Sequence, residues 1–251
     1  MSPRILVVTA VAAEADSVAD GPAVDVPLPG GFTLRRHAPA HTRPGTDTGP
    51  VVDVLVAGVG PAAAAVATAT ALAHATTHRP YDLVVSAGIA GGFRPGAPLG
   101  TVVVADAVVA ADLGVRTDDG YLAVEELGFG RSAHRVPEAL TKAAAGALAH
   151  GGLPHVVGTV LTVSTVTGTA ARAAELAERH PGAAAEAMEG FGVAEAAAAY
   201  GLPVLEIRAV SNAVGPRDRA AWRIGEALDA LRHAFRLLTH TVFTDPEGIP
   251  Q

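Results

Sequence analysis

Two glutamates occupy apolar surroundings, where a carboxylate needs either a hydrogen-bond partner or a cleft. Glu14 follows two alanines at the end of an apolar run. Glu189 lies in the segment Ala-Ala-Ala-Glu-Ala-Met-Glu-Gly-Phe-Gly, where nearly every neighbour is small or apolar. An unpaired buried charge is costly, so both are candidate catalytic carboxylates. Glu186 and Glu195, nearby in the chain, are interpreted as solvated helix positions.

A third candidate group lies in the apolar run 204–215. This run carries Glu206 and Arg208 and then ends in Ser211, Asn212 and Gly215. Polar groups at the end of a buried strand are well placed to face a ligand. From these residues alone, an asparagine turn closed by glycine is the simpler interpretation.

Glycine-rich segments follow two other apolar runs. Residues 83–92 predict a buried strand that runs into a glycine-rich turn, where a ligand could approach backbone N–H groups; a tight turn leaving the sheet fits equally well. Gly58 and Gly60 form an incomplete dinucleotide-binding pattern. Because Asp82 precedes the next strand instead of ending it, the acid that would bind a ribose is missing and an oxidoreductase is disfavoured.

Composition excludes several other classes of protein. The net charge is −7 with no basic cluster, which argues against a nucleic-acid partner. There is no cysteine, no His-Glu-x-x-His metal motif among the 10 histidines and no Gly-x-Ser-x-Gly elbow, so we expect no metal and no cofactor. No apolar stretch reaches the ~20 residues of a membrane span. The run 5–13 is expected to be a buried strand and not a signal peptide, and the protein to be cytoplasmic.

Short Val/Leu/Ile runs alternate with Ala-rich runs, which predicts one α/β domain over 1–251 with a sheet covered on both faces. Residues 20–50, rich in Gly, Pro and Thr, predict an exposed hairpin excursion around one short strand. The expected strands are 5–10, 32–37, 51–57, 83–87, 101–109, 155–163 and 204–210. The expected helices are 61–77, 137–150, 169–180, 189–200 and 219–240.

Taken together and in this order, the segment with Glu14, the Ser-Ala-Gly-Ile-Ala-Gly-Gly turn, the Ala-Met-Glu-Gly segment and the Arg-Ala-Val-Ser-Asn strand end resemble the purine nucleoside phosphorylase and nucleosidase family. Within it, they are similar to the futalosine hydrolases of menaquinone biosynthesis, and the resemblance covers nearly the whole chain. It implies a twisted mixed β-sheet flanked by helices and assembly as a homo-oligomer. It also implies that Met188 closes a strand and that Glu189 opens a helix.

The resemblance also implies roles in cleavage of a purine–ribose bond. Glu189 would accept a hydrogen bond from the ribose 2′-hydroxyl and stabilise the oxocarbenium-like sugar, and Glu14 would deprotonate the attacking water. Met188 would form an apolar wall beneath the ribose, while Val166 and Thr167 would offer backbone groups to the purine. The other predicted substrate-binding positions lie in the same segments: Ile89, Ala90, Gly91, Ala187, Arg208 and Ser211.

Two residues depart from the family pattern. Relatives that act on 6-aminopurines carry Asp where this chain has Asn212. An amide can donate to a 6-oxo group while its carbonyl accepts from a protonated N7, which suits hypoxanthine and makes Asn212 a hydrogen-bonding group and not an acid. Ala187 stands where many relatives have another glutamate, so contacts to the outer ribose hydroxyls must come from elsewhere.

The segment 9–14 holds no cation and contains a carboxylate, which would repel phosphate and favours water as the nucleophile. The resemblance therefore implies a nucleosidase that splits futalosine into hypoxanthine and dehypoxanthine futalosine. The alternatives are a methylthioadenosine/adenosylhomocysteine-type nucleosidase, an inosine phosphorylase and a non-catalytic nucleoside-binding protein. Arg94, Arg116 and Arg217 are candidate cations for the carboxylated aromatic tail of the substrate, although no motif places them.

Overall fold

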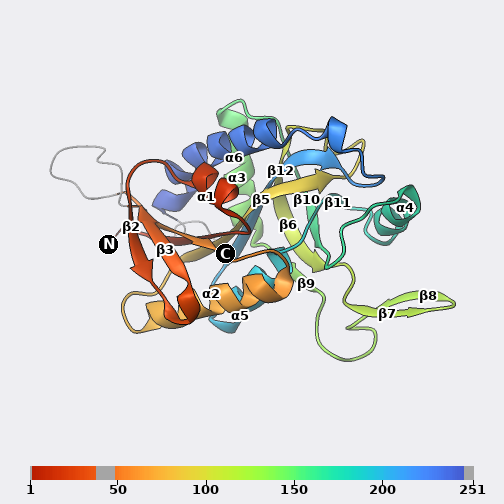
Figure 1. Cartoon of the computed structure of the whole chain (residues 1–251), viewed down its shortest axis with the longest axis horizontal. Coiled ribbons are helices and arrows are strands. Elements are labelled where there is room, and N and C mark those ends of the chain that lie inside the picture. The colour runs from red at the N-terminus through yellow and green to blue at the C-terminus, as the bar shows by residue number, and fades with distance from the viewer. Residues whose placement is uncertain (1, 38–48, 246–251) are drawn as a thin grey trace.

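A computed structural model describes residues 2–37 and 49–245, and a long twisted sheet runs through it (Figure 1). Ten strands form this mixed sheet in the order β11-β10-β6-β12-β5-β1-β4-β3-β2, and β9 pairs with β6. Strands β7 and β8 form a separate antiparallel pair. The strands are β1 (Arg4–Thr9), β2 (Ala23–Pro27), β3 (Thr33–His37), β4 (Val51–Val56), β5 (Leu83–Gly92), β6 (Val102–Ala110), β7 (Gly114–Thr117), β8 (Gly120–Ala123), β9 (Ala133–Arg135), β10 (His155–Thr162), β11 (Ala183–Ala187) and β12 (Val204–Ala213).

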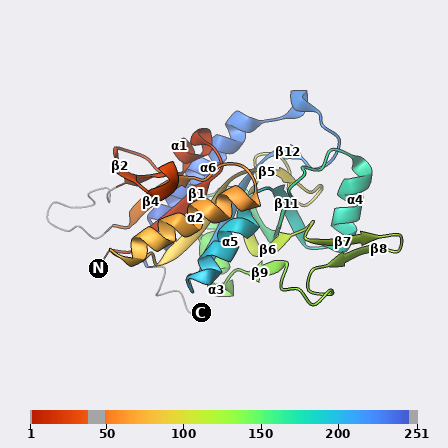
Figure 2. The same cartoon turned by 60° about the horizontal axis from the view of Figure 1, so that its bottom comes forward.

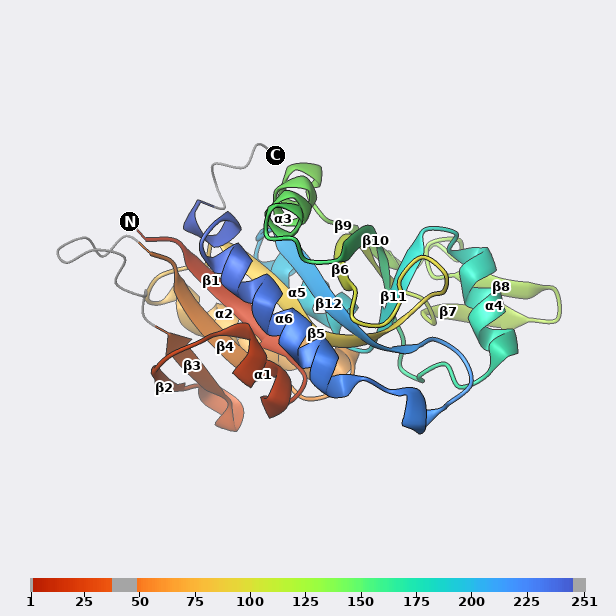
Figure 3. The ribbon, with the colours of Figure 1, turned by 90° about the horizontal axis from the view of Figure 1, so that it is seen from above.

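Helices cover both faces of the sheet. Helices α1, α3 and α6 lie on one face, and α2 and α5 lie together on the other (Figures 1 and 3). Helix α4 stands beside the β7–β8 pair at one end of the molecule (Figure 2). The helices are α1 (Ala12–Val18), α2 (Pro61–Thr76), α3 (Glu138–His150), α4 (Ala170–Arg179), α5 (Gly190–Ala199) and α6 (Ile224–Thr239), and short 3₁₀ turns occur at Pro29–Gly31, Arg219–Ala221 and Val242–Thr244. The predicted α/β class with a flanked mixed sheet is therefore confirmed.

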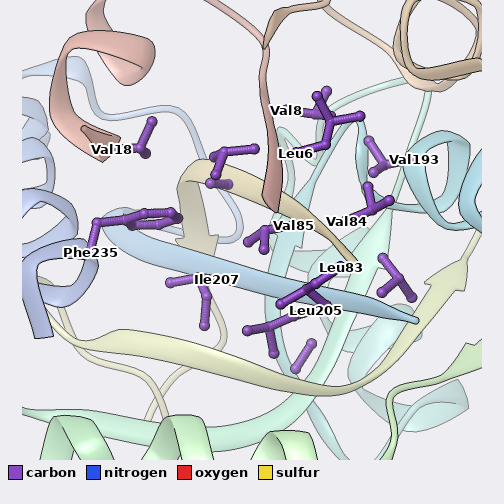
Figure 4. Close-up of a cluster of buried hydrophobic side chains, with 14 of the residues drawn as sticks. Leu6, Val8, Val18, Leu83, Val84, Val85, Val193, Leu205, Ile207 and Phe235 are labelled. Carbon is purple, nitrogen blue, oxygen red and sulfur yellow. The ribbon is translucent and has the colours of Figure 1, made fainter. Parts of the chain in front are cut away.

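The core is built from strand residues buried on both faces. Leu6, Val85, Leu205 and Ile207 are fully buried in the central strands. Phe235 of α6 lies on the side of Ile207 and Val85, and Val193 of α5 lies on the side of Leu6 (Figure 4). Each apolar side chain of this size removed from water contributes about 1.5–3 kcal/mol. The nearly continuous apolar strands predicted this burial, because a sheet with two covered faces needs no alternation of polar residues.

One end of the sheet closes on itself. Strand β11 pairs in parallel with β10 and also, antiparallel, with β5, where Ala185 faces Gly92 and Glu186 faces Gly91. Strands β5, β12, β6, β10 and β11 thus form a closed ring. This closure explains why the Ala-rich segment Ala183–Ala187 is a strand, since two neighbouring strands supply backbone partners that outweigh alanine's helix propensity.

Several predicted boundaries were wrong. The expected turn after residue 87 is strand, because β5 continues to Gly92 along β12. Strand β12 likewise continues to Ala213, so Ser211 and Asn212 belong to a strand and not to an asparagine turn. The last helix begins at Ile224 and not at residue 219, after a 3₁₀ turn.

The excursion predicted over 20–50 is a hairpin with two strands and not one. Strand β2, whose side chains are largely exposed, pairs antiparallel with β3. The part of this prediction that falls on residues 38–48 lies outside the described residues. Across the described ranges, no helix is long and apolar enough to cross a bilayer.

Candidate active site

The carboxylate of Glu14 is held by backbone N–H groups from the segment after β1 and from β5. Its Oε2 accepts hydrogen bonds from the N–H groups of Ala10 (3.0 Å) and Val11 (3.3 Å), which follow β1 directly. Its Oε1 accepts from the N–H of Ile89 in β5 at 2.9 Å. Glu14 is only 4% exposed, so these three donors replace water around a buried charge. The first turn of α1 therefore presents a rigidly held carboxylate between the ends of β1 and β5.

Glu189 lies at the junction between β11 and α5. Its Oε1 accepts from the N–H of Gly60 at 3.2 Å, and its Oε2 accepts from the N–H of Met188 at 3.3 Å. Its Oε2 also lies 3.3 Å from Nη1 of Arg208. The strand closes at Ala187 and the helix opens at Gly190, so the predicted boundary at Met188 and Glu189 is displaced by one residue on each side. The Gly60 loop, a weak dinucleotide pattern in the sequence, contacts this glutamate.

Arg208 is the cation that joins the two glutamates. Its side chain is 1% exposed, and its Nε donates to Oε1 of Glu206 at 2.8 Å while Nη2 donates to Oγ of Ser86 at 3.1 Å. Burial would lower the pKa of Arg208, but Glu206, Glu189 and Glu14 outweigh burial and raise that pKa above its ordinary value. One fully charged guanidinium therefore faces three carboxylates.

Gly88 makes the approach of these groups possible. A Cβ at this position in β5 would lie 2.7 Å from Nη1 of Arg208 and would collide with Oε1 of Glu14. Only glycine leaves room for both polar atoms. The glycine-rich sequence predicted that a ligand could approach the backbone here, whereas Gly88 also makes the packing of two side chains possible. The same distances place Oε1 of Glu14 and Nη1 of Arg208 next to the same backbone position.

Asn212 lies at the end of β12, paired with Gly91 of β5. Its Oδ1 accepts from Oγ of Ser211 at 2.9 Å, and its Nδ2 donates to the backbone oxygen of Ala213 at 3.0 Å. Asn212 is half-buried, whereas Ser211 is buried and also lies 3.3 Å from the backbone oxygen of Ala90. These contacts orient the amide and leave one Nδ2 hydrogen and one Oδ1 lone pair unused by the described residues.

Glu186 is buried, and its interpretation as a solvated helix position was wrong. It belongs to β11, is 5% exposed, and accepts from both the N–H (2.9 Å) and the hydroxyl of Thr167. Burial raises the pKa of Glu186, and the two bonds from Thr167 offset part of that rise. The position was missed because alanine propensity predicts a helix there. Glu195 does lie on α5 and pairs with Arg131 at 2.8 Å.

The other predicted substrate-binding residues surround these groups. Thr167 is buried against Glu186, whereas Val166 beside it is 49% exposed. Met188 is half-buried next to Glu189, and Ala187 is buried. The structure thus brings the segments around β1, β5, β11 and β12 together, as well as the loop after β10 that contains Val166 and Thr167. Ser86 was given no role in the sequence, and Glu206 was named only as part of the polar group in the run 204–215 and not as a site residue.

The three candidate arginines for a substrate tail lie in different places. Arg94 is exposed after β5, and Arg116 pairs with Glu175 at 2.8 Å on the β7–α4 side. Arg217 has its guanidinium carbon 5.5 Å from the ring centre of Trp222, and its Cγ lies 3.9 Å from the position of a Cβ on Gly168. Arg217 is thus the one of the three that packs beside the loop of Val166 and Thr167.

A cavity of about 420 Å³ lies elsewhere, between α1, the β3–β4 region and α6. None of its lining residues is a predicted site residue, so it does not define the candidate site. Among residues 2–37 and 49–245, no group of three or more acidic or histidine side chains could hold a metal ion.

The family described as the Phosphorylase superfamily matches residues 4–243. The chain belongs to this superfamily. It is 62% identical over 235 residues to the futalosine hydrolase of Streptomyces coelicolor, covering 92% of this chain and 93% of that protein. It is 48% identical over 248 residues to the futalosine hydrolase of Acidothermus cellulolyticus, covering 99% and 95%. Within the superfamily, the chain is therefore a member of the futalosine hydrolase group.

A solved structure supports the fold independently of sequence identity. The native structure of futalosine hydrolase from Helicobacter pylori superposes with a TM-score of 0.78, covering 95% of this chain and 98% of that one, at 16% identity. At so low an identity this likeness concerns the fold alone. The predicted resemblance to the nucleoside phosphorylase and nucleosidase family is confirmed.

Proposed function

We propose that this chain hydrolyses the N-glycosidic bond of futalosine and releases hypoxanthine and dehypoxanthine futalosine, a step in menaquinone biosynthesis. Two relatives that share 62% and 48% of their residues over nearly the whole chain carry this activity in their names. The position of Glu14 favours hydrolysis over phosphorolysis, because its carboxylate already accepts hydrogen bonds from three backbone N–H groups. Those donors are what an anionic phosphate would otherwise use.

In this proposal Glu189 acts on the ribose. Bond cleavage develops positive charge on the sugar, and a carboxylate that accepts a hydrogen bond from the 2′-hydroxyl stabilises that charge most in the transition state. Glu189 is held at 3.2–3.3 Å by two backbone N–H groups and lies 3.3 Å from Arg208. Met188 and Arg208 both meet Oε2, so Oε1, which accepts only from Gly60, keeps a lone pair for a substrate hydroxyl. Met188, the adjacent residue, supplies an apolar surface beneath the sugar.

Glu14 acts on water. A carboxylate oxygen has two lone pairs, and Oε1 gives one of them to Ile89. The remaining acceptor site can orient a water molecule and take its proton as the water attacks the anomeric carbon. Because N–H groups from the segment after β1 and from β5 fix the carboxylate, the base is positioned before substrate binds.

Asn212 acts on the departing base. Its Nδ2 can donate to the 6-oxo group of hypoxanthine while its Oδ1 accepts from a protonated N7, and Ser211 fixes the amide in this orientation. The 6-amino group of adenine would instead meet a donor, which leaves two donors facing each other. This preference disfavours the methylthioadenosine-type alternative.

Arg217 binds the carboxylated aromatic tail of the substrate. It lies beside Trp222, and the N–H of the next residue, Arg223, donates to the backbone oxygen of Ser211 at 2.8 Å. An indole and a guanidinium together offer stacking and a charge-assisted hydrogen bond, which match an aromatic carboxylate. A single nucleosidase domain, assembly as a homo-oligomer and a cytoplasmic location belong to the same proposal.

An assay of product and phosphate dependence tests this function. Purified protein should release hypoxanthine from futalosine in phosphate-free buffer, with little action on methylthioadenosine. A strict requirement for phosphate would make the chain a phosphorylase, and faster release of adenine than of hypoxanthine would overturn the role of Asn212. No release from any nucleoside would favour the alternative of a non-catalytic binding protein.

A further inference from the structure

Glu206 is a buried carboxylate that the proposed reaction does not use. It lies near the start of β12 with 0% exposure, and its Oε1 accepts from Nε of Arg208 at 2.8 Å and lies 3.4 Å from Oγ of Ser86. Its Oε2 has no hydrogen-bond partner among the described residues. Burial of a carboxylate is costly, and a strand core would be satisfied by an apolar residue here. The position therefore calls for a reason other than stability.

Glu206 and Ser86 take up one side of the Arg208 guanidinium. Nε bonds to Glu206, and Nη2 bonds to Ser86. Only Nη1 is directed toward the reacting carboxylates: it lies 3.3 Å from Glu189 and borders the same position at Gly88 as Glu14. The guanidinium thus meets Glu189 through one nitrogen and not through two.

This restriction matters because arginine and carboxylate prefer a bidentate pair. If the guanidinium were free to turn, two of its N–H groups could bond both oxygens of Glu189. Those bonds would occupy the lone pairs that the proposed mechanism reserves for the ribose hydroxyl, and they would draw Nη1 away from Glu14. A guanidinium held in one orientation places positive charge near both glutamates and leaves their remaining lone pairs free.

We propose that Glu206, together with Ser86, is a positioning residue that holds Arg208 in a single orientation, so that Glu189 and Glu14 stay available to sugar and water. This inference rests on the proposed function for what the two glutamates do, but the orientation of Arg208 does not depend on it.

The backbone at the start of α5 leaves space for the carboxylate of Glu206. A Cβ on Gly190, the first residue of α5, would collide with both carboxylate oxygens of Glu206, so the carboxylate lies against the start of that helix. The partial positive charge of a helix N-terminus favours a negative group there. Gly190 also follows Glu189 directly, so the same turn of chain places the ribose-binding carboxylate and accommodates the positioning one.

Three variants test the proposal by steady-state kinetics with futalosine. Glu206→Leu removes the acceptor for Nε and should lower kcat about 10- to 100-fold while KM changes less than about threefold, because the lost alignment acts in the transition state. Glu206→Gln keeps an oxygen for Nε and should stay within about fivefold of wild-type kcat. Asp53→Asn, which disturbs a buried ion pair remote from the site, is the matched control and should leave kcat unchanged. Wild-type kcat in Glu206→Leu would overturn the proposal, as would equal losses in the Leu and Gln variants.

The kinetics of a Ser86 variant and crystal structures of the variants test the proposal further. If Glu206→Leu does not fold, Ser86→Ala should lower kcat about 3- to 10-fold, and an unchanged kcat would contradict the proposal. In a crystal structure of Glu206→Gln, the guanidinium of Arg208 should keep its wild-type orientation. In whichever of Glu206→Leu and Ser86→Ala folds, it should be turned toward Glu189. An unmoved Arg208 in that second structure would overturn the proposal even if wild type proved inactive. If wild type cleaves another nucleoside instead of futalosine, the function proposal fails, and the kinetic ratios are measured on that nucleoside.

Discussion

Two buried charged clusters lie near opposite ends of β1, and they are built on opposite principles. In the first, Asp53 of β4 accepts from Arg4 at 2.6 Å, from Arg36 at 2.8 and 3.0 Å, and from Tyr81 at 2.7 Å. In the second, Arg208 is surrounded by Glu206, Glu189 and Glu14. The first has two cations for one carboxylate, and the second has one cation for three.

The pKa values follow this balance. Burial alone would raise the pKa of Asp53, but hydrogen bonds from Arg36, Tyr81 and Arg4 outweigh burial and hold that pKa below its ordinary value. Burial raises the pKa of Glu206, and Arg208 offsets only part of the rise. A fully satisfied cluster ties strands together, whereas a cluster with excess carboxylate retains acceptors for a substrate at a cost in stability. The difference separates a structural cluster from a reactive one.

Substitutions in the reactive cluster should lower turnover more than any other change. Glu14→Gln or Glu189→Gln should lower kcat about a thousandfold or more, because the base or the group that stabilises the sugar cation is lost. Steady-state assays measure the rate, and circular dichroism should show an unchanged fold. Glu195→Gln on α5, which changes a carboxylate paired with Arg131 outside the cluster, is the control and should retain wild-type kcat. A variant of Glu14 or Glu189 with wild-type turnover would remove that residue from the mechanism.

The next effect breaks the structural cluster. Asp53→Asn should lower the free energy of unfolding by about 3 kcal/mol, because it leaves Arg4 and Arg36 with a neutral partner in a buried site. Because the folded-state pKa of Asp53 lies below its unfolded value, its contribution is present at neutral pH and is lost as pH falls through the folded pKa. Urea unfolding of wild type and variant from pH 7 down to pH 3 measures the difference, which should shrink toward acid. A variant as stable as wild type at pH 7 would contradict the contrast between the two clusters.

Arg217 lies outside both clusters, and its substitution should change KM for one substrate only. Arg217→Gln should raise KM for futalosine about tenfold, as expected for loss of one exposed charge-assisted bond, while KM for inosine stays unchanged. Inosine carries the same base without the tail, so the ratio of the two KM values isolates the tail. Arg94→Gln is the matched control. Equal changes on both nucleosides would mean that Arg217 does not contact the tail.

Removing the charge of Glu206 is expected to have the smallest effect, a change in the free energy of unfolding. Because the pKa of Glu206 is raised in the folded protein, folding favours its neutral form, and its contribution to stability falls as pH rises above the unfolded pKa. A permanently neutral side chain escapes this loss. Glu206→Gln should therefore be more stable than wild type by roughly 1 kcal/mol at pH 8, and this gain should vanish toward pH 4. Urea unfolding at the two pH values tests the sign, and a Gln variant less stable than wild type at pH 8 would contradict it.

Much of the fold could be predicted because β1, β4, β5 and β12 are apolar runs bounded by Gly, Pro or polar residues. The segment Ala183–Ala187 could not, because alanine's propensity indicates a helix and only the ring closure with β5 and β10 makes it a strand. The same long-range pairing buries Glu186, which the local sequence indicated as solvated.

The candidate site divides in the same way. Glu14, Glu189 and Asn212 were singled out by composition and by resemblance, because a charge in an apolar segment is visible along the chain. The convergence of Arg208, Ser86 and Glu206 depends on pairing between β5 and β12, which brings residues about 120 positions apart into contact. The spacing of these residues along the sequence does not predict that pairing.

In the proposed mechanism, Glu14 allows water to act as the nucleophile at this site and excludes phosphate. Phosphorus NMR of a reaction run with futalosine and excess inorganic phosphate tests it most directly, with hypoxanthine release followed in the same tube. We predict full release of hypoxanthine with inorganic phosphate as the only phosphorus signal. A new resonance from a sugar 1-phosphate that grows with hypoxanthine would contradict the account.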